Sequence, residues 1–352
     1  MRMLFVFITI LISSSVASME FGARVKVGSP LIAFGDSMTA GNAASDTAHR
    51  YTNLLASRIS GSLNNQSVSG TGMAQQSRAA FPVVPVLNNS VISVMAGFND
   101  LLRTGPASFT KIETNLRAFI AGAILKEAVP ASAMRQVGTW VSAGASDGGK
   151  SLSLGGTGLY TTSASAYLEW DFFGETLVVG SWTTISAASG GTYKDFAISI
   201  DGVSVGNFFA NGATDDAYPA TNFNARVFKD LGFTKHTVRL SPIASGAYTI
   251  IDYVGTLAAP GSVAPVLVAQ IPSMTNWTYN GNTLSPATLA EANARIASVV
   301  AEFPGWARLA PTNDFYTPGA CCTAADGQHP SDAGMAQIAN AFKSQICLTS
   351  VW

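Results

Sequence analysis

The strongest constraint on the fold is an alternation of strand-like and helix-like patterns that stops in the middle of the chain and later resumes. From Pro30 to about Glu127, short apolar runs alternate with stretches whose apolar residues recur at helical spacing. Val91 to Met95 is β-branched and apolar, as a strand buried on both faces should be. Phe109 to Lys126 is typical of an amphipathic helix. Strands that alternate with helices predict a parallel sheet covered on both sides, and the same pattern returns after Pro260. We predict further strands at 31–34 and 266–271 and further helices at 51–59, 285–300 and 331–346.

Between these two parts, residues 131–261 have no helical periodicity. Turn signals such as Asp201-Gly202 separate short runs of β-forming residues. Regularly spaced short strands predict a β-sandwich or jelly roll, inserted between a helix and the next strand of the α/β part. The predicted strands lie at 166–172, 176–179, 196–200 and 236–240, and further turn signals lie at 147–149, 155–156 and 189–191.

The first 18 residues have the layout of a secretory signal. A positive start at Met1-Arg2-Met3 precedes an apolar run from Leu4 to Ile12 and small residues up to Ser18. That run is too short to cross a bilayer as a helix, so the alternative is a buried first strand. We expect an exported protein, either secreted or at a periplasmic or extracellular surface. The predicted domains are a signal at 1–18, an α/β domain in two parts at 19–130 and 262–352, and the inserted β-domain at 131–261.

Export would permit disulfides. The three cysteines are Cys321, Cys322 and Cys347, all near the end of the chain. We expect one of the adjacent pair to bond to Cys347, and the sequence leaves open which of the two it is.

The charge balance excludes several classes of protein. Twenty Lys and Arg residues against 21 Asp and Glu give a net charge of −1, without the basic footprint that nucleic-acid binding requires. A hydrophobic fraction of 47% argues against disorder, and no apolar run after the signal is long enough for a membrane helix. Charged residues make up 12% of the chain, about half of the usual fraction, which predicts a neutral surface rich in hydroxyl groups.

The first motif with chemical content is Gly35-Asp36-Ser37, directly after a predicted strand. Open α/β sheets bind ligands at the carboxyl ends of their strands, so the Ser37 hydroxyl would lie where a substrate binds. Its backbone N–H would point toward a developing oxyanion. Taken alone, this tripeptide is also common in turns and helix caps.

Two further loops offer neutral hydrogen-bond donors. Gly70, with Gly72 nearby, permits close approach of the backbone N–H to a ligand. Asn99, in Gly97-Phe98-Asn99-Asp100, carries an amide that can bind an oxyanion without losing a proton. The alternatives are a turn at Gly70 and a helix cap at Asn99, and we expect Asp36 and Asp100 to be loop and cap supports.

The fourth motif, Asp326-Gly327-Gln328-His329-Pro330, precedes the last predicted helix. A general base must reach the serine hydroxyl while an acceptor holds its other nitrogen, and Asp326 lies three residues before His329. The other histidines, His49 and His236, are expected to be structural or on the surface.

In this order, the four blocks resemble those of the SGNH hydrolases, also called GDSL esterases and lipases. The resemblance covers about 30–128 and 262–348 and says nothing of the inserted segment. It implies a flavodoxin-like three-layer α/β/α sandwich. It also implies Ser37 as nucleophile, His329 as general base and Asp326 as the carboxylate that orients His329. The Ser37 N–H, the Gly70 N–H and the Asn99 side chain resemble the oxyanion hole.

These residues predict ester hydrolysis without a cofactor. His329 would take the Ser37 proton during attack on an ester carbonyl, and would then protonate the leaving alcohol. No group of histidines and cysteines has the spacing of metal ligands, so no metal is expected.

The inserted domain points to the substrate. Rings such as Trp140, Trp170, Trp182, Tyr193 and Tyr218 could stack on sugars, although alternation predicts Trp170 and Phe172 in the core. We therefore expect an O-acylated, most often O-acetylated, polysaccharide or cell-wall glycan. Some carbohydrate esterases of the resembled family carry such β-domains. The alternatives are an acyl-lipid or thioester hydrolase, with an apolar rim drawn from Met38, Met73, Phe98, Leu101 and Leu102, and a glycan-binding surface or virion component with an inactive hydrolase domain. The oligomeric state stays open.

Overall fold

The computed structural model describes residues 23–80, 90–143, 146–147, 150–151, 158–184, 195–208, 221–279 and 282–349. The predicted signal at 1–18 lies outside the described residues, as do the turn signals at 148–149, 155–156 and 189–191 and the rings of Tyr193 and Tyr218.

A five-stranded parallel sheet forms the centre of the α/β domain. Its strands lie in the order β22 (Ala307–Ala310), β19 (Val266–Ala269), β4 (Val91–Met95), β2 (Leu31–Gly35) and β3 (Leu63–Asn65). Every residue of β2, β4 and β19 is buried, because helices cover both faces of the sheet. The predicted strands at 31–34, 91–95 and 266–271 are confirmed, although the last ends at Ala269.

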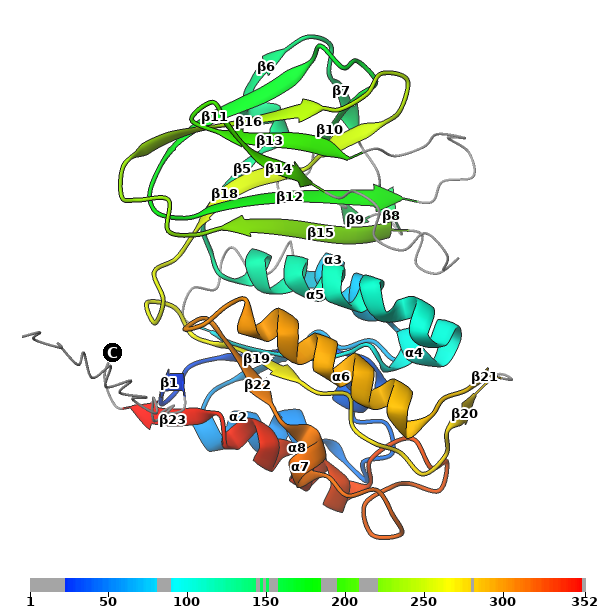
Figure 1. Cartoon of the computed structure of the whole chain (residues 1–352). Coiled ribbons are helices and arrows are strands. Elements are labelled where there is room, and N and C mark those ends of the chain that lie inside the picture. The colour runs from blue at the N-terminus through cyan, green and yellow to red at the C-terminus, as the bar shows by residue number, and fades with distance from the viewer. Residues whose placement is uncertain are drawn as a thin grey trace, which may run out of the picture.

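Helices lie on both sides of this sheet (Figure 1). One side carries α3 (Met73–Ala80), α5 (Phe109–Ala123) and α6 (Pro286–Ala301), and the other carries α2 (Tyr51–Ile59) and α8 (Asp332–Lys343). The rings of Tyr51 and Phe342 stack between α2 and α8, with centroids 5.2 Å apart. Ser285 caps α6 by accepting the Thr288 N–H, as the sequence predicts for a helix that begins at a proline. Shorter elements are α1 (Ser37–Ala40), α4 (Phe98–Thr104), α7 (Thr312–Phe315), β1 (Ala23–Lys26), β23 (Ile346–Thr349), β20 (Thr278–Tyr279), β21 (Asn282–Thr283) and the 3₁₀ turns η1 (Thr47–His49), η3 (Gly105–Ser108) and η4 (Ala131–Ala133).

The inserted segment forms antiparallel sheets that stand above the α/β domain in Figure 1. One sheet has the order β15-β12-β18-β5, a second has the order β14-β13-β16-β11-β6, and a third has the order β17-β10-β7. Leu177 and Val179 from the first sheet and Leu168, Ile198 and Leu240 from the second share one hydrophobic core. The strands are β5 (Leu125–Pro130), β6 (Arg135–Val137), β7 (Val141–Ala143), β8 (Ser146–Asp147), β9 (Lys150–Ser151), β10 (Gly158–Thr161), β11 (Tyr167–Phe173), β12 (Leu177–Thr184), β13 (Phe196–Ile200), β14 (Val203–Phe208), β15 (Thr221–Phe228), β16 (Lys235–Pro242), β17 (Thr249–Ile251) and β18 (Tyr253–Leu257). This domain is called the β-domain below.

The β-domain begins and ends earlier than the predicted 131–261. Its first strand, β5, starts at Leu125 and pairs antiparallel with its last strand, β18, which ends at Leu257. Helix α5 consequently ends at Ala123 instead of continuing to Lys126. The chain thus enters and leaves the β-domain on two adjacent strands, the arrangement that lets a domain be inserted into a host fold.

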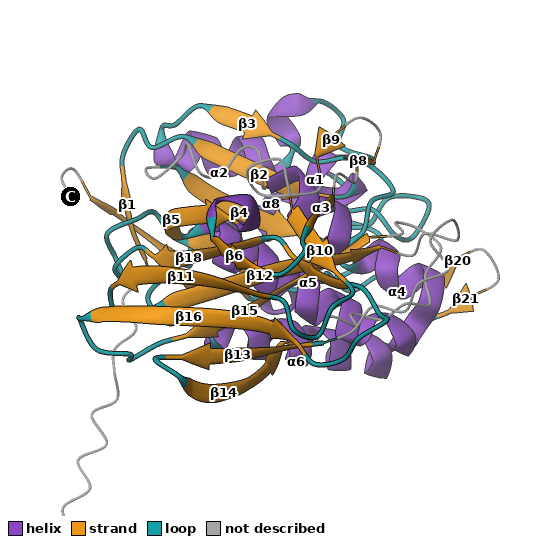
Figure 2. Cartoon of the chain, turned by 90° about the horizontal axis from the view of Figure 1, so that it is seen from above, coloured by secondary structure: helices purple, strands orange, loops and turns teal. Residues whose placement is uncertain are grey.

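Helix α5 lies directly beneath β15, and the strands of the β-domain overlie it in Figure 2. The buried Asn115 of α5 accepts the Phe223 N–H on its Oδ1 at 2.7 Å, and its Nδ2 lies 3.3 Å from the Asn222 Oδ1. Trp182 and Phe223 of the β-domain belong to the same hydrophobic core as the helices and strands of the α/β domain. The two domains therefore share a core.

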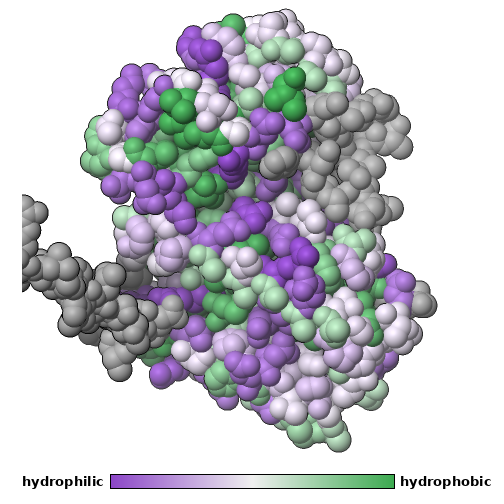
Figure 3. Space-filling model, viewed as in Figure 1, coloured by the Kyte–Doolittle hydropathy of each residue, from purple (hydrophilic) through white to green (hydrophobic). Residues whose placement is uncertain are grey.

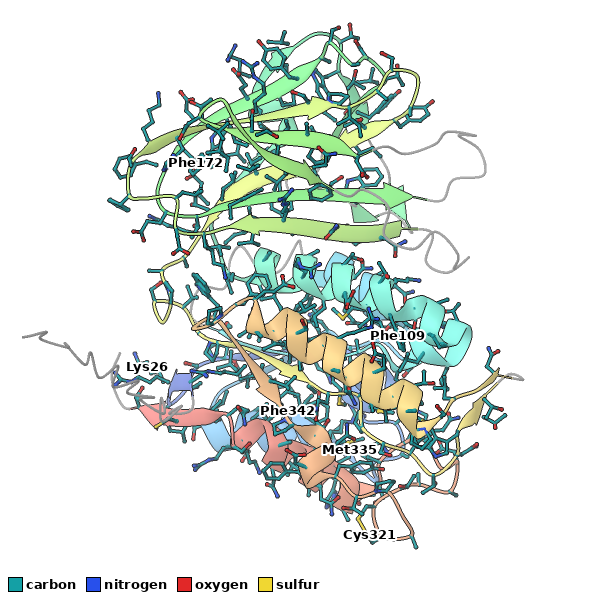
Figure 4. The ribbon with its side chains drawn as sticks, in the orientation of Figure 1. Lys26, Phe109, Phe172, Cys321, Met335 and Phe342 are labelled. Atoms are coloured by element: carbon teal, nitrogen blue, oxygen red, sulfur yellow. A yellow bond between two sulfur atoms is a disulfide. The ribbon has the colours of Figure 1, made fainter. Side chains whose placement is uncertain are left out.

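The cysteines correct the predicted disulfide. Cys321 and Cys322 bond to each other, and Cys347 is an exposed free thiol. Cys321 lies on the loop before α8 (Figure 4), whereas Cys347 follows that helix. A helix of 12 residues carries the chain about 18 Å along its axis, which separates Cys347 from the loop.

Membrane-spanning helices were sought in the described part of the chain, and none is both long and apolar enough.

Candidate active site

Ser37 lies at the turn between β2 and α1. Asp36 caps α1 by accepting the Met38 N–H on its Oδ1 at 3.0 Å, and Ser37 is the first residue of the helix. Gly35 has a φ of +156°, and a Cβ at this position would lie 2.0 Å from the Thr39 Oγ1. The turn therefore requires glycine before the Asp-Ser pair, because no side chain fits between the strand and the helix.

The last motif brings His329 to the same turn. The His329 Nε2 lies 2.8 Å from the Ser37 Oγ, and the Nδ1 lies 2.5 Å from the Asp326 Oδ2. The other oxygen of Asp326 accepts the backbone N–H groups of Gln328 and His329 at 2.9 and 3.0 Å. Partial burial opposes ionisation of Asp326, but the bonds from these N–H groups and the His329 ring outweigh it, so its pKa lies below the ordinary value. Asp326 is therefore a carboxylate near neutral pH.

The loop that carries Asp326 and His329 is held from the opposite side. The Gly327 carbonyl accepts the Thr275 and Asn276 N–H groups, both at 2.9 Å, and the Asn276 side chain donates to the Asp326 carbonyl at 3.1 Å. Gly327 has a φ of +72°, and a Cβ there would lie 2.6 Å from that of Asn276. These contacts fix the turn from which the imidazole reaches Ser37.

The Gly70 loop lies beside the turn that carries Ser37. Gly70 has a φ of +78°, a conformation that favours glycine, and its carbonyl accepts a hydrogen bond from Arg103 at 2.6 Å. The Gly72 N–H is engaged by the Gln75 Oε1 at 2.7 Å, which argues against Gly72 as an oxyanion donor. The Gly70 N–H stays the predicted donor of this loop.

Asn99 lies at the start of α4, between the two loops. Its Nδ2 donates to the Thr71 carbonyl at 3.0 Å and lies 3.4 Å from the Asp36 Oδ2. The structure thus brings the Asn99 amide to the neighbours of both Gly70 and Ser37. All five residues that the sequence singles out for the site converge at the carboxyl end of β2 and β4.

Buried charges support this arrangement from below. The Asp100 Oδ2 accepts the Met73 N–H at 2.8 Å at the start of α3, and the Lys111 Nζ lies 3.9 Å from the Asp100 Oδ1. Burial, reinforced by the charge of Asp100, raises the pKa of Asp36 to about 7. The predicted support roles of Asp36 and Asp100 are confirmed. The buried Lys111 was missed, because a lysine in an amphipathic helix is typically on its exposed face.

The other two histidines lie outside this site. His236, on β16, bonds to Asp201 through Nδ1 at 2.7 Å. His49 is half-exposed and contacts Asp46 through Nδ1 at 2.8 Å.

A family model matches the first part of the α/β domain. Residues 33–152 match the model of the GDSL-like Lipase/Acylhydrolase family, and this span carries Ser37, Gly70 and Asn99. The chain contains a GDSL-like acylhydrolase domain. It is accordingly a carboxylic ester hydrolase. The match ends in the first part of the β-domain, before the segment of Asp326 and His329.

No curated protein matches the chain. Solved structures include the crystal structure of TesA, at 15% identity over 90% of this chain and 97% of that chain, with a TM-score of 0.41. A two-domain esterase active on acetylated mannans, co-crystallised with mannopentaose, matches at 8% identity over 67% of this chain and 91% of that chain, with a TM-score of 0.32. A family 35 carbohydrate binding module from Clostridium thermocellum matches at 17% identity over 38% of this chain and 99% of that chain, with a TM-score of 0.28.

Proposed function

We propose that this acylhydrolase is a secreted serine esterase that removes O-acyl groups, acetyl above all, from a polysaccharide or cell-wall glycan. One observation carries the catalytic part of the proposal. An unbroken chain of hydrogen bonds runs from the Ser37 hydroxyl through both nitrogens of His329 to the Asp326 carboxylate. This is the arrangement that activates a serine for nucleophilic attack.

The reaction follows from the placement of these groups. Asp326 accepts the Nδ1–H of His329, which leaves Nε2 free to accept the Ser37 proton as the Oγ attacks the ester carbonyl. The N–H groups of Ser37 and Gly70 and the Asn99 amide bind the negative oxygen of the tetrahedral intermediate. His329 then protonates the leaving alcohol oxygen, and an acyl ester remains on Ser37. Water, activated by His329, attacks this ester and releases the carboxylic acid.

The strand order supports the finer description of the fold. The strands lie side by side in the order β3-β2-β4-β19-β22. Numbered along the chain, this is the 2-1-3-4-5 order of flavodoxin-like sheets. We infer a three-layer α/β/α sandwich for the hydrolase domain, with Ser37 after β2, the first strand of the sheet along the chain.

Polar residues around the site favour a hydroxyl-rich substrate. The Ser69 hydroxyl donates to the Asn42 Oδ1 at 3.2 Å on the exposed surface between the nucleophile turn and the Gly70 loop. Asn276 and Thr275 border the opposite side, beside the Asp326 loop. The apolar residues that an acyl-lipid substrate would need at the rim are buried instead, none more than 3% exposed: Met38, Met73, Phe98, Leu101 and Leu102.

A surface pocket on the β-domain supports contact with a polymer. It has a volume of about 410 Å³ and lies at the end of β11. Figure 3 shows hydrophobic residues gathered on the side of the β-domain where Figure 4 labels Phe172. In Figure 1, α4 and the β20–β21 hairpin of the α/β domain lie on the opposite side of the molecule. We propose that this pocket binds sugar rings of the polymer at a distance from the scissile ester, through ring stacking and hydrogen bonds to the carboxylates. Its lining residues are Glu127, Trp170, Asp171, Phe172, Phe173 and Lys235.

Labelling with a serine-reactive phosphonate tests the catalytic assignment. We expect one adduct on Ser37, found by peptide mass spectrometry and absent in Ser37→Ala and His329→Ala. A folded wild-type protein without an adduct would contradict the esterase proposal and favour an inactive, glycan-binding protein. Release of acetate from acetylated glycans, measured beside release of long-chain acids from lipids, then tests the substrate class.

A second pair of variants tests the pocket. Phe173 is 59% exposed and packs edge-to-face on Phe233, so Phe173→Ala removes ring surface without disturbing a core. We expect weaker binding to the acetylated polymer with unchanged turnover of a small aryl acetate. Val203→Ala, an equally exposed apolar site on β14, is the control and should change neither. Equal polymer binding by all three proteins would contradict this part of the proposal.

Secretion is tested separately. We expect the protein recovered from its natural producer to lie outside the cytoplasm and to begin near residue 18. A protein that retains Met1 inside the cell would contradict it.

A further inference from the structure

A buried glutamine lies between three of the four motif blocks without belonging to any of them. Gln76 is the fourth residue of α3 and is only 1% exposed. Its Oε1 accepts the Gly35 N–H at 2.9 Å, and its Nε2 donates to the Thr71 Oγ1 at 2.6 Å. The Thr71 carbonyl in turn accepts the Asn99 amide at 3.0 Å. One side chain thus joins the strand before the nucleophile to the Gly70 loop, and through Thr71 to Asn99.

The backbone explains why an acceptor is needed at Gly35. Along this edge of β2, the carbonyls of Ala33 and Gly35 accept the N–H groups of Gln66 and Val68, which continue beyond β3. The Gly35 N–H points to the same side, where β3 has already ended. The Gln76 carbonyl oxygen takes the place of the missing strand partner. Without it, a buried backbone N–H would have no partner at the residue that precedes Asp36 and Ser37.

The second bond requires a donor. The Thr71 hydroxyl donates to the Val68 carbonyl at 2.5 Å, so its oxygen can only accept from Gln76. An amide offers one acceptor and one donor on a single rigid group, which matches both partners. A carboxylate would offer acceptors alone and would bury a charge, and an apolar side chain would leave both partners unpaired.

We propose that Gln76 is a positioning residue for the oxyanion hole. It sets the separation between the Ser37 turn and the Gly70 loop, and through Thr71 it sets the orientation of the Asn99 amide. It acts through Gly35 and Thr71 and does not touch the substrate. The proposal rests on the proposed esterase function, because it assigns Gln76 a part in the same site.

The test compares Gln76→Met, Thr71→Val and the double variant on an aryl acetate. Met keeps the length of the side chain, and Val keeps the shape of threonine while removing the hydroxyl. We expect kcat to fall about 10- to 100-fold in each single variant, with little change in KM. This loss is smaller than that caused by removing an oxyanion-hole donor, which lowers kcat about 10²- to 10³-fold. Phosphonylation of Ser37 should slow by a similar factor. Because both changes break one shared bond, the double variant should lose little more than the worse single variant.

Asn293→Leu is the matched control. Asn293 is also buried and also makes two hydrogen bonds, to the N–H and the carbonyl of Ile271, at 2.7 and 3.0 Å. We expect it to lower the melting temperature as Gln76→Met does while keeping kcat within about threefold, because both lost hydrogen bonds are made to Ile271 and neither involves Gly35, Thr71 or Asn99.

Three results would overturn the proposal. These are wild-type kcat in folded Gln76→Met, additive losses in the double variant, or a loss of kcat in Asn293→Leu as large as in Gln76→Met. If Gln76→Met does not fold, Thr71→Val decides, since it breaks the same bond from the other side. Failure of the esterase function itself is distinguished by the wild-type protein, which would then neither hydrolyse the ester nor react at Ser37.

Discussion

The hydrolase domain and the β-domain each hold a histidine against an aspartate, with different partners for the second nitrogen. His329 meets Asp326 at 2.5 Å and His236 meets Asp201 at 2.7 Å, both through Nδ1. The Nε2 of His329 faces the Ser37 hydroxyl at 2.8 Å, whereas that of His236 faces the Gly232 carbonyl at 3.1 Å. A His-Asp pair is therefore not by itself a catalytic feature. The group at the other nitrogen decides what the ring can do.

The two partners have different consequences for protonation. A carbonyl only accepts, so His236 satisfies Asp201 and Gly232 together only with a proton on each nitrogen. The bond to Asp201, followed by that to Gly232, raises the pKa of His236. A hydroxyl can donate, so a neutral His329 can donate to Asp326 and accept from Ser37 at once. His236 suits a structural tie, and His329 suits a base.

The largest expected effect concerns the boundary between the two domains. Deleting 125–257 removes Trp182 and Phe223 from the shared core and uncovers α5, whose buried residues include the polar Lys111 and Asn115. We expect an insoluble or unfolded product, because the two domains that the sequence predicts as separate units share one core. Size-exclusion chromatography and circular dichroism measure the outcome. A soluble monomer with a cooperative melt would show that the β-domain is dispensable for folding.

The next effect compares the two histidines directly. We expect His329→Ala to lower kcat on an aryl acetate by about 10⁴-fold or more, because the serine loses its base. His236→Gln should keep the wild-type kcat, since its bonds lie within the β-domain. Steady-state kinetics on both folded variants provide the measurement. A comparable loss in His236→Gln would mean that the β-domain pair also acts on the reaction.

The sequence predicts the site better than it predicts the domain boundaries. Gly35-Asp36-Ser37 and the Asp326–His329 pair are local patterns, and the carboxyl ends of parallel strands bring such patterns together. The boundary at Leu125 was missed because β5 follows α5 with one residue between them and is identified only by its pairing with β18. Pairing between strands so far apart in the sequence cannot be recognised from the residues near Leu125 alone.

Residues that act through others were also missed. Gln76 belongs to no motif, and its two bonds are made to Gly35 and Thr71, which lie on other elements. The bond between Cys321 and Cys322 was missed because the expected partner, Cys347, lies beyond α8. In each case the contact depends on where helices and strands place distant residues in space, and the sequence pattern does not contain this information.

The third effect concerns the buried carboxyl of Asp36, next to Ser37 in the chain. Asp36 has a pKa of about 7 against an ordinary value of 3.8, so the folded state holds its proton more tightly than the unfolded state. Stability should fall as the pH rises from about 4 to 7, by up to about 4 kcal/mol for a shift of this size. Asp36→Asn should lack this decline, because the amide does not ionise. Urea unfolding at several pH values measures it.

Asp46→Asn supplies the control for Asp36. Asp46 is exposed, and its hydrogen bond to the His49 ring lowers its pKa, so its contribution to stability is lost as the pH falls instead. The two variants should differ from the wild-type protein with opposite slopes against pH. Equal slopes would contradict the assignment of the decline to Asp36.

The smallest effect returns to the structural histidine. Because the pKa of His236 is raised and that of Asp201 is lowered, their bond is strongest where both are charged, between the ordinary values of 3.8 and 6.5. Its contribution should be lost as the pH rises through the folded pKa of His236. His236→Gln should therefore be less stable than the wild-type protein by a margin that is largest near pH 5.5 and shrinks toward pH 8.5, measured as unfolding midpoints in urea. A margin independent of pH would show that the ring contributes by packing against Phe172, with centroids 5.3 Å apart, instead of by its charge.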